Sequence, residues 1–214
     1  MEVVRLLSGP LGVNTYIARK GAAKDCFIVD PADESQALEH LDKHGLKCTH
    51  ILLTHGHFDH ILGVARLQKE LGAKVAIHKQ DADGLWDSRI NLSNMAGISV
   101  APCRADILLE DGDRLTAAGL TVDVIATPGH TKGGVCFVIN DERVMFSGDT
   151  LFLQSVGRCD LPGSSSEALY ESIQYRLFAL SGDYQVYPGH MGRTTLEYER
   201  KNNPYMKQWN MNKW

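Results

Sequence analysis

Residues 54–63, "THGHFDHILG", place three histidines and an aspartate within six positions, directly after the apolar run "HILLT". The four residues are His55, His57, Asp59 and His60. Imidazoles crowded together repel one another when protonated and lose hydration when buried, so this cluster costs stability unless a cation lies among them. A divalent metal ion is the usual cation in such a cluster. The residue types and their spacing therefore predict a metal site.

A structural, fully ligated zinc ion is the main alternative to a catalytic metal. Structural zinc sites favour cysteine ligands and closed tetrahedra. The five cysteines of this chain are scattered without a CxxC spacing, which argues against a thiolate zinc site and against a disulfide framework. The cysteines are therefore expected to be reduced thiols. A set of His and Asp ligands leaves room for a water molecule on the metal, so we predict a catalytic metal site.

Three more residues of ligand type lie at the ends of apolar runs further along the chain. His130 ends "VIATPGH", Asp149 ends "VMFSGD" and His190 ends "QVYPGH". The carboxyl ends of strands form the edge where open α/β sheets usually place their sites. We therefore expect these three side chains to meet the first cluster at one edge.

The spacing within the first cluster indicates more than one ion. In extended chain alternate side chains share a face, so His55 and His57 can bind the same ion. The turn into the following helix directs Asp59 and His60 to a position a few ångströms away. Two adjacent metal ions are therefore predicted.

The elements that carry these residues are short apolar runs and amphipathic helices. Runs rich in Val, Ile and Phe that end at polar residues are typical of strands, whereas apolar residues at helical spacing before a glycine are typical of helices. The predicted strands are 3–7, 14–18, 26–30, 50–54, 74–78, 120–127, 134–140, 143–149 and 184–189. The predicted helices are 34–45, 61–72 and 164–180, with a less regular stretch over 81–111.

The two halves of the chain resemble each other, because each contains several predicted strands and at least one predicted helix. No low-complexity segment or linker separates the halves. We therefore predict an α/β fold in which two sheets pack together between outer helices, a four-layer αββα sandwich in one domain over residues 1–214.

Composition excludes several classes of partner. The chain has 22 Lys and Arg against 26 Asp and Glu, a formal net charge of −4, and no basic stripe interleaved with aromatic residues, so nucleic acid is not an expected partner. The start "MEVVRLLSGPLG" lacks the pattern of a signal peptide, and no apolar run is long enough for a membrane span. A cytoplasmic protein without a membrane partner is the expectation.

Four of these stretches, "THGHFDH", "TPGHT", "FSGDTLF" and "YPGHM", resemble the signature motifs of the metallo-β-lactamase superfamily, in the same order. The pieces "GRCDLPG" (157–163) and "ERKNNPY" (199–205) resemble the compact glyoxalase II-like branch, whose members hydrolyse hydroxyacylglutathione. The resemblance covers nearly the whole chain. It implies the metallo-β-lactamase fold, an αββα sandwich with a binuclear centre.

The resemblance also divides the ligands between the two ions. It implies His55, His57 and His130 on one ion, Asp59, His60 and His190 on the other, and Asp149 as a bridge between them. Zinc is the expected metal, with iron and manganese as alternatives. Two close cations would lower the pKa of a shared water from 15.7 to about 7 or below, so that a bridging hydroxide is the nucleophile.

A thioester suits such a site best. A thiol with a pKa near 8.5 leaves as thiolate without a proton donor, whereas an alcohol or amine needs one, and the motifs contain no additional acid. Asp59 is placed to orient the nucleophile or accept its proton. The predicted activity is therefore hydrolysis of a small-molecule thioester such as hydroxyacylglutathione.

Two further residues have predicted roles, and one departure from the branch leaves the thiol open. Arg158 could bind a substrate carboxylate, although Asp160 beside it would repel one. Asp30 is either a partner of a ligand histidine or a turn residue. Glyoxalase II holds glutathione with a helical C-terminal domain, and residues 191–214 are too few to form one.

Other functions fit parts of the same pattern. A mononuclear iron persulfide dioxygenase is similar to this chain at His55, His57, His130 and Asp149 and would bind Fe(II) there. A lactone or ester hydrolase on the same fold is a second alternative, and a metal-bound protein without turnover is a third. The oligomeric state stays open.

Overall fold

A computed structural model of the chain describes residues 1–212 and contains two six-stranded sheets. The first sheet has the order β1-β2-β3-β4-β5-β6, and the second has the order β14-β13-β10-β9-β8-β7. The strands of the first sheet are β1 (Glu2–Ser8), β2 (Val13–Arg19), β3 (Asp25–Val29), β4 (Lys47–Leu53), β5 (Lys74–His78) and β6 (Ile107–Leu109). Those of the second are β7 (Arg114–Ala117), β8 (Leu120–Ala126), β9 (Val135–Ile139), β10 (Val144–Gly148), β13 (Gln185–Pro188) and β14 (Thr194–Thr195).

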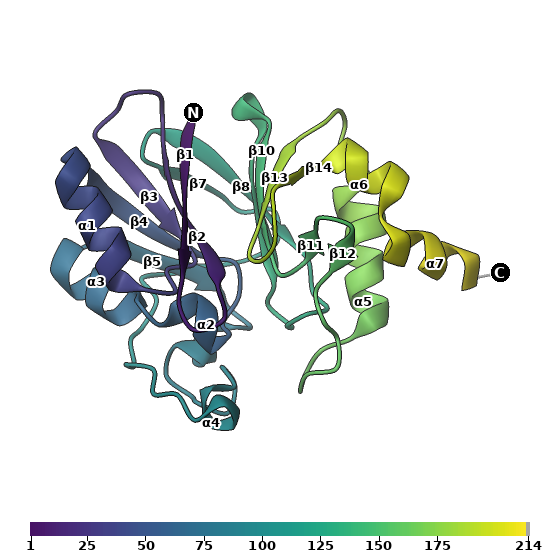
Figure 1. Cartoon of the computed structure of the whole chain (residues 1–214), viewed down its shortest axis with the longest axis horizontal. Helices are drawn as coiled ribbons and strands as arrows, with labels where there is room; N and C mark the ends of the chain where they lie inside the picture. The colour runs from purple at the N-terminus through teal and green to yellow at the C-terminus, as the bar shows by residue number, and fades with distance from the viewer. Residues whose placement is uncertain (213–214) are drawn as a thin grey trace.

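Helices lie on the outer face of each sheet (Figure 1). Helices α1 (Glu34–His44) and α3 (Val64–Leu71) cover the first sheet, and α5 (Ser166–Glu171) and α6 (Leu196–Asn202) lie beside the second. The remaining helices are the short α2 (Phe58–Ile61) and α4 (Ser93–Ala96) and the C-terminal α7 (Pro204–Asn212). Within residues 1–212, none of the helices has the length and apolar composition needed to cross a membrane.

Three layers of apolar side chains separate these four layers of structure. Successive residues of a strand point to opposite faces of the sheet. In β3, Phe27 and Val29 accordingly belong to the core between the two sheets, while Cys26 and Ile28 pack toward α1 and α3. Strand β9 does the same on the other side, with Phe137 between the sheets. Because both faces are buried, these strands are almost continuously apolar in sequence.

Aromatic side chains from both sheets hold the sheets together. Phe27 in the first sheet meets Phe146 in the second edge to face, with ring centroids 6.0 Å apart. Tyr16 lies 5.4 Å from Phe146 and donates its hydroxyl proton to the Pro188 carbonyl oxygen at 2.7 Å. The predicted four-layer αββα sandwich is therefore confirmed.

Two predicted helices differ in the structure, because contacts with residues far away in the sequence change their course. The helix predicted over 61–72 is broken, because Gly63 packs against the backbone of residues 31–34 and donates to the Pro31 carbonyl oxygen at 2.9 Å. A Cβ at Gly63 would lie 2.8 Å from the Glu34 nitrogen. The helix predicted over 164–180 becomes a π-helix over Ser172–Leu177, where the Ser172 hydroxyl donates to the Pro128 carbonyl oxygen.

Several short elements were not predicted. They are β6, β7, β14, α4, α6, α7 and the small hairpin of β11 (Leu151–Phe152) and β12 (Ser155–Val156). Strand β6 lies in the stretch predicted as irregular and completes the edge of the first sheet beside β5. Strands of two to four residues carry too few positions for a period of two to be recognised.

Candidate metal centre

The predicted ligand residues all lie where strands of the two sheets end. His55 follows β4, Asp149 follows β10 directly, His190 follows β13, and His130 lies in the loop after β8. The first sheet therefore supplies the first cluster and the second sheet supplies the other three side chains. The structure brings all seven residues named by the sequence to one place between the sheets.

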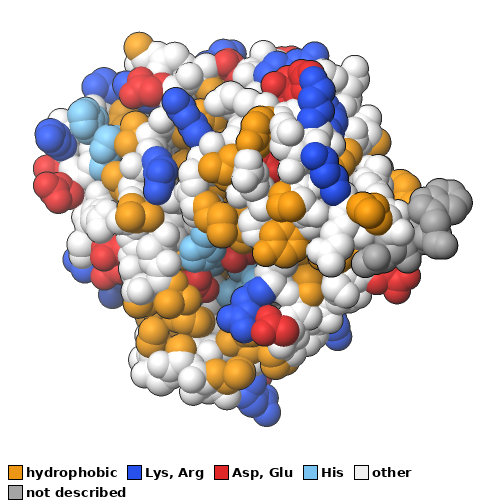
Figure 2. Space-filling model, turned by 45° about the vertical axis from the view of Figure 1, so that its right-hand side comes forward, with side chains coloured by type: hydrophobic (Ala, Val, Ile, Leu, Met, Phe, Trp, Pro, Cys, Tyr) orange, Lys and Arg blue, Asp and Glu red, His pale blue; other side chains and the backbone are white. Residues whose placement is uncertain are grey.

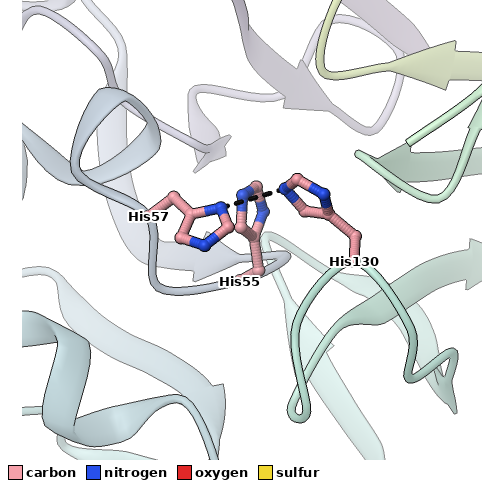
Figure 3. A group of neighbouring side chains, drawn as sticks. All are labelled: His55, His57 and His130. Atoms are coloured by element: carbon pink, nitrogen blue, oxygen red, sulfur yellow. Dashed lines mark hydrogen bonds between the residues drawn. The ribbon is translucent and has the colours of Figure 1, made fainter. Parts of the chain in front are cut away.

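The first group of side chains consists of His55, His57 and His130 (Figure 3). Their ligand atoms lie within 4.8 Å of one another, and His57 Nδ1 is 2.9 Å from His130 Nε2. All three rings are buried, with at most 6% of each residue exposed. Three imidazoles in this arrangement can bind one divalent cation.

The second group consists of Asp59, His60 and His190. Asp59 Oδ2 lies 3.5 Å from His190 Nε2 and 3.7 Å from His60 Nε2. His60 is completely buried, and the His190 side chain is 24% exposed. One carboxylate and two imidazoles are also a common ligand set for a divalent cation.

Asp149 lies between the two groups. Its Oδ1 is 3.4 Å from His60 Nε2, and its Oδ2 is 3.6 Å from both His130 Nε2 and His190 Nε2. The first group therefore contributes one histidine that faces this carboxylate, and the second group contributes two. The position is that of a carboxylate able to bind two cations at once.

Hydrogen bonds on the far side of three rings decide which nitrogen faces the centre. His60 Nδ1 donates to Asp30 at 3.0 Å, and His130 Nδ1 donates to the Arg158 carbonyl oxygen at 2.8 Å. His55 Nδ1 lies 3.1 Å from the Thr54 hydroxyl oxygen. Because each Nδ1 is used in this way, Nε2 is left with a lone pair for a metal.

Asp30 connects two of these bonds. Its carboxylate accepts from the Thr54 backbone amide at 2.8 Å and the Thr54 hydroxyl at 2.6 Å, as well as from His60. Asp30 also has a positive φ of 50°, a conformation that is uncommon for a residue other than glycine. Its oxygens are thus occupied by groups that orient the first cluster, which is the role of a partner of ligand histidines.

The electrostatic environment differs between the two groups. Burial, with neighbouring imidazoles, lowers the pKa of His55 well below its usual value and that of His57 to about 3. Burial also lowers the pKa of His60, but the carboxylates of Asp149, Asp59 and Asp30 outweigh it and raise that pKa to about 10. His55 and His57 are therefore neutral at pH 7, and His60 carries a second ring proton when no cation is bound.

Three polar atoms at the centre test whether a metal fits these residues. Within the part of the chain that the structure describes, His55 Nε2, His60 Nε2 and Asp149 Oδ1 are buried and have no hydrogen-bond partner. Buried polar atoms are nearly always satisfied, and leaving one unsatisfied costs about 1–3 kcal/mol. All three are atoms of ligand type that face the centre, so the donor set fits divalent metal ions.

Asp81 is a supporting residue that the sequence analysis missed. It is buried, and its carboxylate accepts from the backbone amide of Gly56 at 3.1 Å and from that of Gly133 at 2.7 Å. These amides belong to the loops of His57 and His130. Asp81 follows the end of β5 by three residues, so the rule that sites gather at strand ends would have drawn attention to it.

Asn14 is a second missed residue and supports His190. Its side-chain amide donates to the Pro188 and Met191 carbonyl oxygens at 2.8 and 2.9 Å. Arg5 in turn donates to the Asn14 side-chain oxygen at 2.7 Å. The first sheet thus fixes the loop of the second sheet that carries His190.

Replacing Asp81 should weaken metal binding although Asp81 is not itself a candidate ligand. We expect Asp81→Asn to weaken metal binding about 10–100-fold, the range for residues that orient ligands. Loss of a charged acceptor for two buried amides should also lower the free energy of unfolding by about 1.5–3 kcal/mol. Asp83→Asn is the matched control, because it makes the same charge change at an exposed position two residues away. Metal titration and urea unfolding measure both effects, and equal behaviour of the two variants would refute the role of Asp81.

A cavity of 640 Å³ opens over the centre, and several residues that flank the candidate ligands in sequence line it. Phe152 and Met191 line it, as does Arg158. The Arg158 side chain donates to both carboxylate oxygens of Asp160, at 2.7 and 2.8 Å. Lys132 lies instead at a neighbouring cavity that shares His57.

The chain belongs to the metallo-beta-lactamase superfamily, whose sequence model matches residues 8–190. Among its relatives, "Probable metallo-hydrolase YqgX" of Bacillus subtilis is 33% identical over 96% of this chain and 98% of the relative. Hydroxyacylglutathione hydrolase GloC of Haemophilus influenzae is 30% identical over 86% of this chain and 88% of the relative. The protein is thus a metallo-hydrolase of a superfamily that binds divalent metals.

Solved structures agree with this assignment. BLEG-1, a B3 metallo-beta-lactamase, superposes with a TM-score of 0.91 at 34% identity, over 96% of this chain and 99% of the other. TTHA1623 in a di-iron-bound form gives 0.84 at 37% identity, over 94% of this chain and 99% of the other.

Proposed function

We propose that this protein is a binuclear hydrolase that cleaves thioesters. The observation that carries the proposal is the shared position of Asp149 between two groups of ligand atoms, one of three histidines and one of Asp59, His60 and His190. Seven ligand side chains are too many for one tetrahedral ion. The di-iron form of the similar TTHA1623 supports a two-metal centre, and zinc, iron and manganese all suit the ligands.

Bound divalent ions supply a Lewis acid for the substrate carbonyl and acidify water near neutral pH. The residues of the chain supply the rest. Asp59 lines the cavity and stays ionised, because His60 and His190 outweigh the effect of burial and hold its pKa well below the usual range. Its carboxylate is placed to orient a nucleophilic water and to accept that water's proton.

The lining of the cavity favours a leaving group that needs no proton. Apart from the ligand residues, Ser155 and Arg158 are the polar side chains among the described residues that line the cavity. Neither is an acid at neutral pH. A thiol with a pKa near 8.5 leaves readily as thiolate, whereas an alcohol does not. The name of the relative GloC, a hydroxyacylglutathione hydrolase, supports the same reaction class.

The test compares matched esters of one acyl group on the metal-loaded protein. We expect a thioester to be hydrolysed about 100-fold faster than the corresponding oxygen ester, the lower range of what a missing general acid is worth. S-D-lactoylglutathione and a simple aliphatic thioester should be assayed side by side, with and without chelator. Oxygen esters or lactones that react faster than both thioesters would contradict the proposal and favour a lactonase.

A second function is favoured by the completeness of the first group. His55, His57 and His130, with Asp149 beside them, can hold one Fe(II) without the other three residues. A mononuclear iron persulfide dioxygenase would use that group alone. It predicts oxygen consumption and one iron per chain, which the thioester assay and metal analysis distinguish directly.

The two groups should differ in how pH affects metal binding. Because the pKa of His60 is raised to about 10, a metal must displace its proton, so affinity at that group should rise about tenfold per pH unit between pH 7 and 10. The lowered pKa values of His55 and His57 mean that these two ligands of the first group bind a metal above pH 7 without releasing a proton. Calorimetric titration of metal-free protein in buffers of different ionisation enthalpy should show proton release with one ion and little with the other. Equal release with both ions would contradict this assignment of charge.

A further inference from the structure

Apart from the candidate ligand residues, the walls of the cavity over the centre are mostly apolar. Candidate ligand residues form one side of it, and the other lining side chains come from five separate parts of the chain. These are the turn between β1 and β2, the start of α2, the segment around α4, the β11–β12 hairpin with the loop after it, and the residue after His190. The apolar lining residues are Leu11, Phe58, Leu92, Met95, Ala96, Phe152, Val156, Leu161 and Met191.

Three of these side chains are large, apolar and strongly exposed. Leu11 is 57% exposed, Met95 68% and Met191 52%. Figure 2 shows His and acidic side chains in a hollow that is bordered largely by hydrophobic side chains. Clustered exposed apolar side chains around a concave site mark a surface that binds an apolar group.

Outside the candidate ligand residues, the lining of the cavity offers no unpaired charge to an ionic substituent. Arg158 is the only Lys or Arg among the described residues that line it, and its guanidinium makes two hydrogen bonds to the carboxylate of Asp160. A carboxylate-bearing group such as glutathione would have to compete with Asp160 for that charge. A hydrocarbon group needs no such exchange and gains by leaving water.

We propose that this cavity binds an uncharged hydrocarbon chain of the substrate, so that the ester cleaved at the centre carries an aliphatic chain on its acyl or its thiol side. The nature of the reaction rests on the proposed function, whereas the binding of the chain rests on the cavity alone. A volume of 640 Å³ lies within the about 300–1,000 Å³ that is typical of small-molecule sites. Each buried methylene should tighten binding about fourfold until the cavity is filled.

Two series of thioesters show which side of the substrate carries the hydrocarbon chain. In the first series the acyl group grows from acetyl to octanoyl on one small uncharged thiol, and in the second an S-alkyl group grows on an acetyl thioester. We expect kcat/KM of the metal-loaded protein to rise about fourfold per methylene in one series, which identifies the side that carries the chain. Values that stay flat or fall in both series would overturn the inference.

Binding without turnover separates this inference from the proposed function. Butanamide, hexanamide and octanamide carry the same chains but no scissile ester, and their Kd for the metal-loaded protein can be measured by NMR titration. We expect Kd to fall about 16-fold with each pair of methylenes. If no thioester is hydrolysed but this trend holds, only the proposed reaction fails. If Kd does not depend on chain length, the inference fails.

A charge at the rim of the cavity should remove the preference for long chains. Met95→Asp places a carboxylate in the lining at a position that is 68% exposed, so the fold itself is not at risk. We expect the ratio of octanoyl to acetyl kcat/KM, or the corresponding S-alkyl ratio, to fall at least about tenfold. Met211→Asp, at a residue that is 78% exposed and does not line the cavity, is the matched control and should keep the wild-type ratio. An unchanged ratio in Met95→Asp would overturn the assignment of this cavity.

Discussion

Asp149→Ala is expected to remove nearly all hydrolysis and to weaken binding of both metal ions. The carboxylate faces His60 with one oxygen and His130 and His190 with the other. Without it, two cations would face each other across a gap with less negative charge between them. Loss of several kcal/mol of transition-state stabilisation corresponds to a decrease in kcat/KM of about 1,000-fold or more.

Asp30→Asn is the control variant for Asp149→Ala. Asp30 accepts from His60 and Thr54 but lies behind the ligands, so its loss should cost only about 10–100-fold. Metal content after dialysis should be measured together with turnover for both variants. If Asp149→Ala kept both ions and wild-type turnover, the carboxylate would not bridge the two groups.

Gly157→Ala should destabilise the protein through a steric effect on the same aspartate. A Cβ at Gly157 would lie 1.8 Å from the Asp149 backbone oxygen and 3.3 Å from His130 Cβ. Backbone atoms cannot move away as a flexible side chain can, so Asp149 and His130 must both shift. We expect the free energy of unfolding to decrease by about 3 kcal/mol, the upper range for overpacking.

Gly192→Ala is the matched control for this substitution. Its Cβ would have the Leu153 Cδ2 atom as nearest neighbour, at 3.7 Å, which is ordinary contact. A change within about 0.5 kcal/mol is therefore expected. Urea unfolding of both metal-free variants, followed by metal titration, measures the difference. Equal stability of the two variants would show that the loop of Gly157 does not constrain Asp149.

The layers of the fold could be predicted because burial on both faces leaves a simple sequence pattern. The runs at 26–30, 134–140 and 143–149 are apolar because each of their strands packs against a sheet on one face and helices on the other. The break at Gly63 could not be predicted, since the helical period continues through it and only its contact with residues 31–34 interrupts the helix. Local pattern carries no information about such a contact.

The candidate site also contains residues that could be predicted from the sequence and residues that could not. Ligand residues have characteristic types and spacing, so the sequence named the seven side chains that the structure brings together, while their assignment to two ions stays a prediction. The position of Asp81 after the end of β5 could have drawn attention to it, but its role and that of Asn14 could not be predicted, because both act on backbone amides or carbonyls of distant loops. Only the folded chain shows which loops these side chains connect.

The metal content of the purified protein tests the two-metal centre most directly. The protein should be produced with zinc, iron and manganese supplied in turn, dialysed, and analysed for metal per chain together with its thioester turnover. We predict about two ions per chain, with turnover that rises with the second ion and is lost with chelator. One iron per chain with oxygen consumption and no thioester hydrolysis would contradict the account.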